Sequence, residues 1–207
     1  VAYDRGATGD GIKVAILDTG ISTNSSDAVN ITDLDAQFAD FTTNSDVVDS
    51  DDVPDDNHGH GTNVAGIIAG EDNGVGYHGV AYDADLHLSD YAQKSGATYY
   101  ASAWANATND ASGAVAQNNS WGVNEQYSSS TSYSTSTLAT MWTNAGLTSN
   151  ASSVQDYLTN LNAFQNDGVI VYALSNTDTY TDADVQAALP EIDSNLAEAW
   201  ITAVNVD

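Results

Sequence analysis

The sequence predicts an α/β fold, with a mostly parallel, twisted sheet and helices on both of its faces. Short apolar runs, which are typical of buried parallel strands, alternate with longer segments whose apolar residues recur at helical spacing. This alternation is typical of strand–helix–strand units, in which each crossover helix covers one face of the sheet. Polar residues directly follow several of the apolar runs, at the edge where such sheets hold functional side chains. A chain of 207 residues fits a single domain.

The first strand is expected at residues 12–17, an apolar run between Gly-Asp-Gly and Asp-Thr-Gly. Residues 22–57 are polar and acidic, so we expect loops there, with one short strand near 37–41. Residues 60–70 combine small and branched apolar side chains. They predict a short, tightly packed helix that Gly70 ends.

The alternation continues from a second strand, expected at 86–89. An Ala-rich stretch that contains Trp104 predicts a helix over 98–112, and apolar residues at helical spacing predict another over 153–167. Apolar runs predict the remaining strands at 114–120, 169–174 and 200–206. Between these elements, residues 123–152 are dominated by Ser, Thr and Asn and predict a polar surface insertion that its aromatic residues partly order.

The chain is strongly acidic, because three Lys and Arg stand against 29 Asp and Glu and give a formal net charge of -26. Bulk electrostatics therefore exclude binding to nucleic acid and to an anionic membrane surface. Salt screens the self-repulsion, which favours a secreted protein from a marine or halophilic setting over ordinary acidic solubility. No apolar run is long enough to span a membrane. No signal peptide is visible, so a secreted protein would be present here in processed form.

Cysteine is absent, which excludes disulfides, a thiol nucleophile and thiolate metal sites. An acid–base pair is carried instead by Asp18, which ends Val-Ala-Ile-Leu-Asp, and His60, which lies in His-Gly-His-Gly-Thr-Asn-Val-Ala-Gly at the start of a predicted helix. A carboxylate at a strand end and an imidazole at a helix start are what a general base and its orienting acid require. The structural alternatives are a turn Asp after a strand and a hydrogen-bonded His at a helix start. Other polar residues expected at the same edge are Ser89, Ser120 and Asn176.

Four ordered segments resemble the subtilisin-like serine proteases (subtilases, peptidase S8). The segments around Asp18 and His60 resemble the first two active-site blocks of that family. Asn118-Asn119-Ser120-Trp121-Gly122 is similar to the segment that pairs with the substrate backbone, and Val169–Asn176 is similar to the strand that ends in the oxyanion-hole Asn. The segment 182–207 is similar to subtilases that are autotransporter passengers of Gram-negative bacteria, which implies a secreted or cell-surface protein.

The resemblance implies a role for each residue. His60 would be the general base, Asp18 would orient it, and Asn176 would donate to the oxyanion. Ser175 stands where the family usually has Gly, and Asn after a strand is also a common turn residue. The substrate residue before the scissile bond would lie against Ser120, Trp121 and Gly122. The alternative for Trp121 is a core aromatic after a strand.

No cofactor is expected for the chemistry, but a structural calcium site is possible in the family. Asp27 and Asn73 occupy the positions that resemble its side-chain ligands, with carbonyl oxygens of Glu71, Val75 and Tyr77 completing the shell. A transition-metal site at His58 and His60 is not expected, because no third ligand is evident and the spacing suits a strand better than a helix start.

The nucleophile of the family is the Ser of Gly-Thr-Ser-x-Ala, and this motif is absent from residues 1–207. We therefore expect the N-terminal portion of a single subtilase catalytic domain, truncated before the nucleophile helix. Its polypeptide substrates would be hydrolysed only with a complementary C-terminal fragment that carries the Ser, and this chain alone is expected to be inactive. The alternatives are a catalytically inactive subtilase-like scaffold used for binding and, without support from the sequence, a metal-dependent hydrolase.

Overall fold

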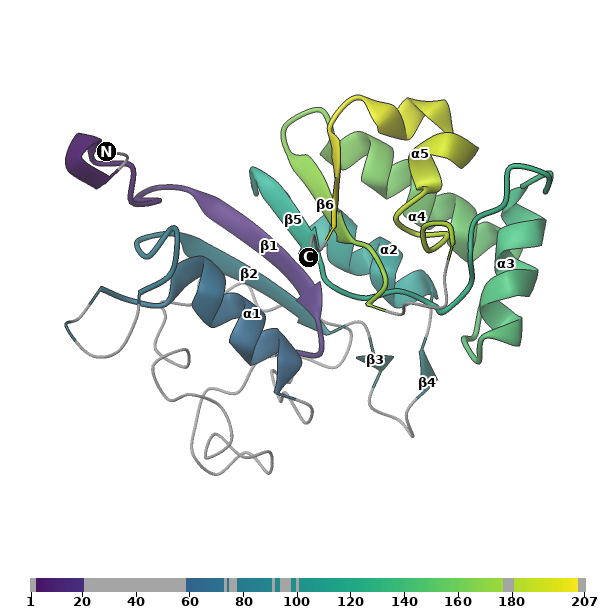
Figure 1. Cartoon of the computed structure of the whole chain (residues 1–207), viewed down its shortest axis with the longest axis horizontal. Helices are drawn as coiled ribbons and strands as arrows, with labels where there is room; N and C mark the ends of the chain where they lie inside the picture. The colour runs from purple at the N-terminus through teal and green to yellow at the C-terminus, as the bar shows by residue number, and fades with distance from the viewer. Residues whose placement is uncertain are drawn as a thin grey trace.

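The expected α/β architecture is present in the computed structural model, which describes residues 3–20, 59–72, 74, 78–90, 92–93, 98–99, 101–176 and 181–204. The five strands of the main sheet run in the order β2-β1-β5-β6-β7, and every neighbouring pair is parallel (Figure 1). These strands are β1 (Lys13–Asp18), β2 (Asp85–Asp90), β5 (Ala116–Asn119), β6 (Val169–Ala173) and β7 (Trp200–Ala203). A separate antiparallel pair joins β3 (Ala92–Gln93) to β4 (Thr98–Tyr99).

Helices cover both faces of the sheet (Figure 1). Helix α1 (His60–Ala69) packs against β1 and β2 on one face, and its Ala65 and Ala69 share a core cluster with Ile16. Helices α2 (Ala101–Asp110) and α4 (Ala151–Phe164) pack on the other face in the larger core. The other described helices are α3 (Thr135–Asn144), α5 (Leu189–Ile192) and two 3-10 turns, Tyr3–Arg5 and Ser194–Ala197.

Helix α4 shows how the local sequence sets an element and its burial. Asn150 begins it with a reciprocal capping box, in which its side chain accepts from the Ser153 backbone and the Ser153 side chain accepts from the Asn150 backbone. Tyr157 lies on the buried face, where its hydroxyl pairs with that of Tyr172 on β6. Burial raises the pKa of both hydroxyl groups, so both remain protonated at neutral pH.

Part of the expected polar insertion belongs to the core. Within 123–152 the structure has helix α3, whose Leu138, Ala139 and Trp142 are buried in the larger core. The Ser134 side chain accepts from the Thr137 backbone and begins the helix. Ser and Thr occupy the outer side of this helix, whereas its inner side is apolar. The segment is therefore more buried than its composition predicts.

The face of the sheet that α1 covers is exposed progressively toward β7. In a parallel sheet, paired residues share a face, and the register pairs Ile16 with Asn118, Asn118 with Val171, and Val171 with Ile201. Along this row Ile16 is 2% exposed beneath α1, whereas Ile201 is 53% exposed. Among the described residues, no helix covers this face of β6 and β7 as α1 covers β1 and β2.

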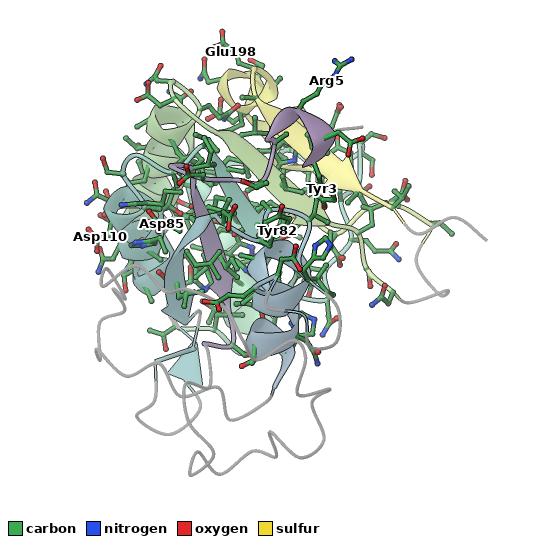
Figure 2. All side chains as sticks on the ribbon, turned by 90° about the vertical axis from the view of Figure 1, so that its left-hand side faces the viewer. Tyr3, Arg5, Tyr82, Asp85, Asp110 and Glu198 are labelled. Atoms are coloured by element: carbon green, nitrogen blue, oxygen red, sulfur yellow. The ribbon has the colours of Figure 1, made fainter. Side chains whose placement is uncertain are left out.

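The N-terminal turn is anchored by aromatic contacts rather than by the sheet. Figure 2 shows Tyr3 beside Tyr82, with ring centroids 5.5 Å apart. His78 completes this group, edge-on to Tyr3 at 5.4 Å and to Tyr82 at 4.9 Å. The Tyr3 hydroxyl also donates to the carbonyl of Val80. These contacts give His78 a structural role.

Replacing Trp142 tests whether α3 belongs to the core. Trp142 is fully buried, 5.1 Å from the Trp104 ring and 6.2 Å from the Tyr157 ring. We expect Trp142→Ala to lower the free energy of unfolding by about 3–5 kcal/mol, because it leaves a cavity among these rings. The matched control is Thr140→Ala on the exposed side of the same helix, which should change the free energy by less than about 0.5 kcal/mol in chemical denaturation. Equal effects would contradict the placement of α3.

Candidate active site

The structure brings Asp18 and His60 together at the carboxyl edge of the sheet. Asp18 ends β1 and is 1% exposed, and its Oδ1 lies 2.7 Å from Nδ1 of His60, the first residue of α1. The Thr19 backbone N–H donates to the same oxygen at 2.8 Å. The His60 ring is 45% exposed. One side of the imidazole is therefore fixed by a buried carboxylate while the ring remains accessible from outside.

The start of α1 is held against the end of β1 by backbone contacts. The Gly61 N–H donates to Oγ1 of Thr19 at 2.8 Å, so a side chain directly after β1 satisfies a donor that a helix start leaves unpaired. A Cβ at position 61 would lie only 2.2 Å from the Gly20 carbonyl oxygen. Glycine is required at residue 61 because any side chain would force helix and strand apart. Gly59, with φ of 83°, supplies the left-handed turn that leads into the helix.

This geometry sets the chemistry that the pair can perform. A carboxylate only accepts hydrogen bonds, so Nδ1 carries the hydrogen and Nε2 is the nitrogen that can take a proton. The helix N-terminus disfavours a charged imidazolium, whereas the adjacent carboxylate favours it. The pair therefore has the geometry that a general base and its orienting acid require.

The segment after β5 lies level with this pair. Asp18 is two residues beyond Ile16, and Ser120 is two residues beyond Asn118, the partner of Ile16, so both lie at the same edge of the sheet. The Asn118 side chain donates to Oγ of Ser120 at 3.0 Å. Ser89, at the end of β2 on the other side of β1, is also at this edge and is buried.

Trp121 is both a core residue and a pocket wall. Its ring packs 4.5 Å from Trp104 and 5.6 Å from Tyr172, measured between centroids. Together with Gly122 and Leu147, these two tryptophans line a cavity of about 350 Å³. The two interpretations of Trp121 are therefore compatible, because one side of the ring packs inward and the residue also bounds an open space next to Gly122.

Asn176 is exposed and follows β6, three residues beyond Ala173. Because β6 pairs with β5, which pairs with β1, Asn176 lies at the same edge as Asp18. The structure thus places Asp18, His60, Ser120, Trp121, Gly122 and Asn176 around one edge of the sheet.

Asp184 is a residue of this edge that the sequence pattern does not single out. It lies 3% exposed, against Gly122: a Cβ at residue 122 would lie 3.3 Å from its Cγ and Oδ2. Burial raises the pKa of this carboxyl, although the Ser175 backbone N–H donates to it and lowers the pKa by a smaller amount. Only the fold brings Asp184 here, because it is remote in sequence from residues 118–122.

The expected calcium ligands Asp27 and Asn73 lie outside the described residues, as do Val75, Tyr77 and His58. Within the described part of the chain, no group of three or more His, Asp or Glu side chains is placed to hold a metal ion. No helix in that part is long and apolar enough to cross a membrane. The calcium site stays a prediction.

Sequence comparison relates the chain to known proteins. Residues 9–207 match the model of the subtilase family, peptidase S8. A relative from Serratia marcescens, described as an extracellular serine protease, is 37% identical over 125 residues, which are 59% of this chain and 10% of that protein. Subtilisin Savinase from Lederbergia lenta is 44% identical over 86 residues, which are 42% of this chain and 28% of that protein.

The fold has relatives among solved structures. Sphericase superposes with a TM-score of 0.52 and 22% identity, covering 94% of this chain and 53% of its own. At this identity the likeness concerns the fold alone. With the family model matching nearly its whole length, the chain belongs to the subtilase family. It spans less than a third of the length of the two curated relatives.

Gly61→Ala tests whether the close approach of α1 holds the Asp18–His60 pair together. The added methyl group would meet the Gly20 carbonyl, so the helix start must shift and the hydrogen bond at Nδ1 should lengthen or break. We expect a loss of about 1–3 kcal/mol in unfolding free energy and loss of the low-field Nδ1 proton signal of His60 in NMR spectra. Ile67→Ala, at an exposed site on the same helix, should leave that signal in place. An unchanged signal in Gly61→Ala would contradict the argument.

Proposed function

We propose that this chain supplies the general base and its orienting carboxylate to a serine endopeptidase that hydrolyses polypeptides. The observation that carries the proposal is the 2.7 Å contact between Asp18 Oδ1 and His60 Nδ1, made by a buried carboxylate and a half-exposed imidazole at the carboxyl edge of a parallel sheet. Membership of the subtilase family supports this assignment. A pure scaffold would need neither the pair nor the Gly61 contact that positions it.

Each residue has a defined step in the proposed reaction. Nε2 of His60 takes the proton of a serine hydroxyl as that oxygen attacks the peptide carbonyl, and returns it to the leaving amine. Asp18 holds the tautomer and stabilises the imidazolium that forms. Asn176, exposed at the end of the next strand but one, donates its side-chain amide to the developing oxyanion. The extended substrate lies along Ser120, Trp121 and Gly122, with its backbone paired to this segment.

The nucleophile is proposed to come from polypeptide beyond Asp207. Residues 1–207 have no Gly-Thr-Ser-x-Ala motif, and the chain spans only part of the length of its relatives. The row from Ile16 to Ile201 supports the idea that further structure packs here, because Ile201, on the edge strand β7, is more than half exposed. A helix bearing the Ser would cover this face and bring its hydroxyl toward His60.

We further propose that the protein acts outside the cell. The Serratia marcescens relative is described as extracellular, and the net charge of -26 without cysteine suits a salty exterior. Display at the bacterial surface as an autotransporter passenger, and a calcium ion at Asp27 and Asn73, belong to the same proposal and rest on the sequence resemblance alone.

The function is tested by labelling the full-length gene product with a fluorophosphonate, which reacts with an activated serine. We expect one labelled serine, and mass spectrometry of peptides should place it outside residues 1–207. The control is the His60→Ala variant, whose serine should not react with the fluorophosphonate because it lacks the general base that activates it. Label on a serine within 1–207 would overturn the location of the nucleophile, and no label together with no peptide hydrolysis would favour the inactive scaffold.

Asp18→Asn tests the role of the orienting carboxylate. The amide keeps the shape of the side chain but favours the wrong tautomer of His60, so we expect kcat to fall on the order of 10⁴-fold in the full-length protein. Asp10→Asn, a change of the same charge at an exposed residue, should leave kcat within about twofold. Peptide hydrolysis under substrate saturation measures both, and a similar small change in the two variants would argue against the role of Asp18.

A further inference from the structure

Asp184 carries a buried carboxylate, and one of its two oxygens lacks a hydrogen-bond donor among the described residues. It is 3% exposed, and no described residue forms a hydrogen bond with its Oδ1. Burying a carboxylate without such partners is costly, and burial is the main reason why the pKa of Asp184 is raised. Among the residues that the structure describes, none supplies a donor to this oxygen.

The backbone fixes Asp184 firmly. Its neighbours join the segment after β5 in an antiparallel bridge, in which Val185 N–H donates to Glu125 at 2.8 Å and Tyr127 N–H donates to Ala183 at 2.9 Å. The carbonyl of Asp184 accepts from Ala188 N–H at 3.0 Å. The carboxylate is therefore held on a rigid support, as binding sites require.

The carboxylate lies between the two segments that are proposed to bind substrate. Its Cγ and Oδ2 face Gly122 on the segment after β5, and the backbone N–H of Ser175, which precedes Asn176 on the segment after β6, donates to it. In the proposed endopeptidase, the side chain of the substrate residue before the scissile bond would lie next to the oxyanion donor, between these two segments. Gly122 has no side chain, so its backbone packs directly against the carboxylate.

No described cation can satisfy Asp184. Arg5 lies in the N-terminal 3-10 turn and Lys13 begins β1, at the amino edge of the sheet, whereas Asp184 is at the carboxyl edge with Ser175 and Gly122. The third basic residue, Lys94, lies outside the described residues. A cationic partner supplied by the substrate fits both the charge and the position.

We propose that Asp184 is a specificity-determining residue that selects a lysine or arginine side chain immediately before the scissile bond. The guanidinium or ammonium group would bind Oδ1 and give the buried carboxylate its missing partner. This inference rests on the proposed endopeptidase function. The strong negative charge of the chain would attract basic peptides in general, so the test must separate Asp184 from bulk electrostatics.

The test uses the full-length protein and peptides that differ only in the residue before the scissile bond, which is Arg, Lys, Leu or Phe. We expect kcat/KM to favour Arg and Lys over Leu. In Asp184→Asn the ratio of Arg to Leu should fall about 10–100-fold, because a hydrogen bond to a charged group is lost. Asp182→Asn is the matched control, since it removes the same charge two residues away at an exposed position.

Thermal unfolding provides a readout without catalysis. Because burial disfavours the charged carboxylate, Asp184→Asn should raise Tm at neutral pH, whereas Asp182→Asn should leave it unchanged. A structural carboxylate would give the opposite pair of results, a lower Tm with an unchanged ratio of Arg to Leu, and this would overturn the proposal. An unchanged ratio of kcat/KM for the Arg and Leu peptides would also overturn the proposal, whatever the change in Tm.

Binding of benzamidine, an arginine side-chain mimic, separates this inference from the proposed function. Calorimetry should detect benzamidine binding to the full-length protein, and Asp184→Asn should abolish it while Asp182→Asn does not. Asp184-dependent binding by a protein that hydrolyses no peptide would refute the endopeptidase and retain the cation pocket. Hydrolysis of peptides without Asp184-dependent selectivity or binding would retain the endopeptidase and refute the pocket.

Discussion

The close approach of helix α1 to the end of strand β1 is the constraint on which the candidate site depends. The missing Cβ of Gly61 and the hydroxyl of Thr19 let the helix start almost in contact with the Gly20 carbonyl. That approach places Nδ1 of His60 at hydrogen-bond distance from a carboxylate that the sheet has already buried. A looser contact would leave Asp18 buried without its partner, which is costly for the fold as well as for chemistry.

The sheet then organises the remaining groups around this contact. Because β1, β5 and β6 are parallel neighbours, the residues that follow each of them share one edge. Gly122 stands at the centre of this edge, with a cavity walled by Trp104 and Trp121 beside it and Asp184 packed against it. One glycine therefore adjoins two environments of different chemistry, an aromatic cavity and a buried carboxylate.

The sequence alone predicts the α/β class, the five strands of the main sheet and the Asp18–His60 pair, because each depends on local pattern. It does not predict α3, since Ser and Thr on the outer side of the helix conceal the spacing of Leu138 and Trp142, although the Ser134 cap is a usable signal. Asp184 could not be found in this way. Its position depends on the pairing of residues 125–127 with 183–185, and single-sequence patterns do not encode such pairing.

The half-covered face of the sheet has a consequence for colloidal behaviour. Strand β7 is an edge strand with Ile201 exposed, and unprotected edges of this kind invite pairing between copies. A net charge of -26 keeps copies apart at low ionic strength, where the Debye length is long. Rising salt shortens that range and strengthens apolar association. The acidity that suits a saline exterior therefore gives residues 1–207 least protection from association at high salt. Coverage of strand β7 matters most under those conditions.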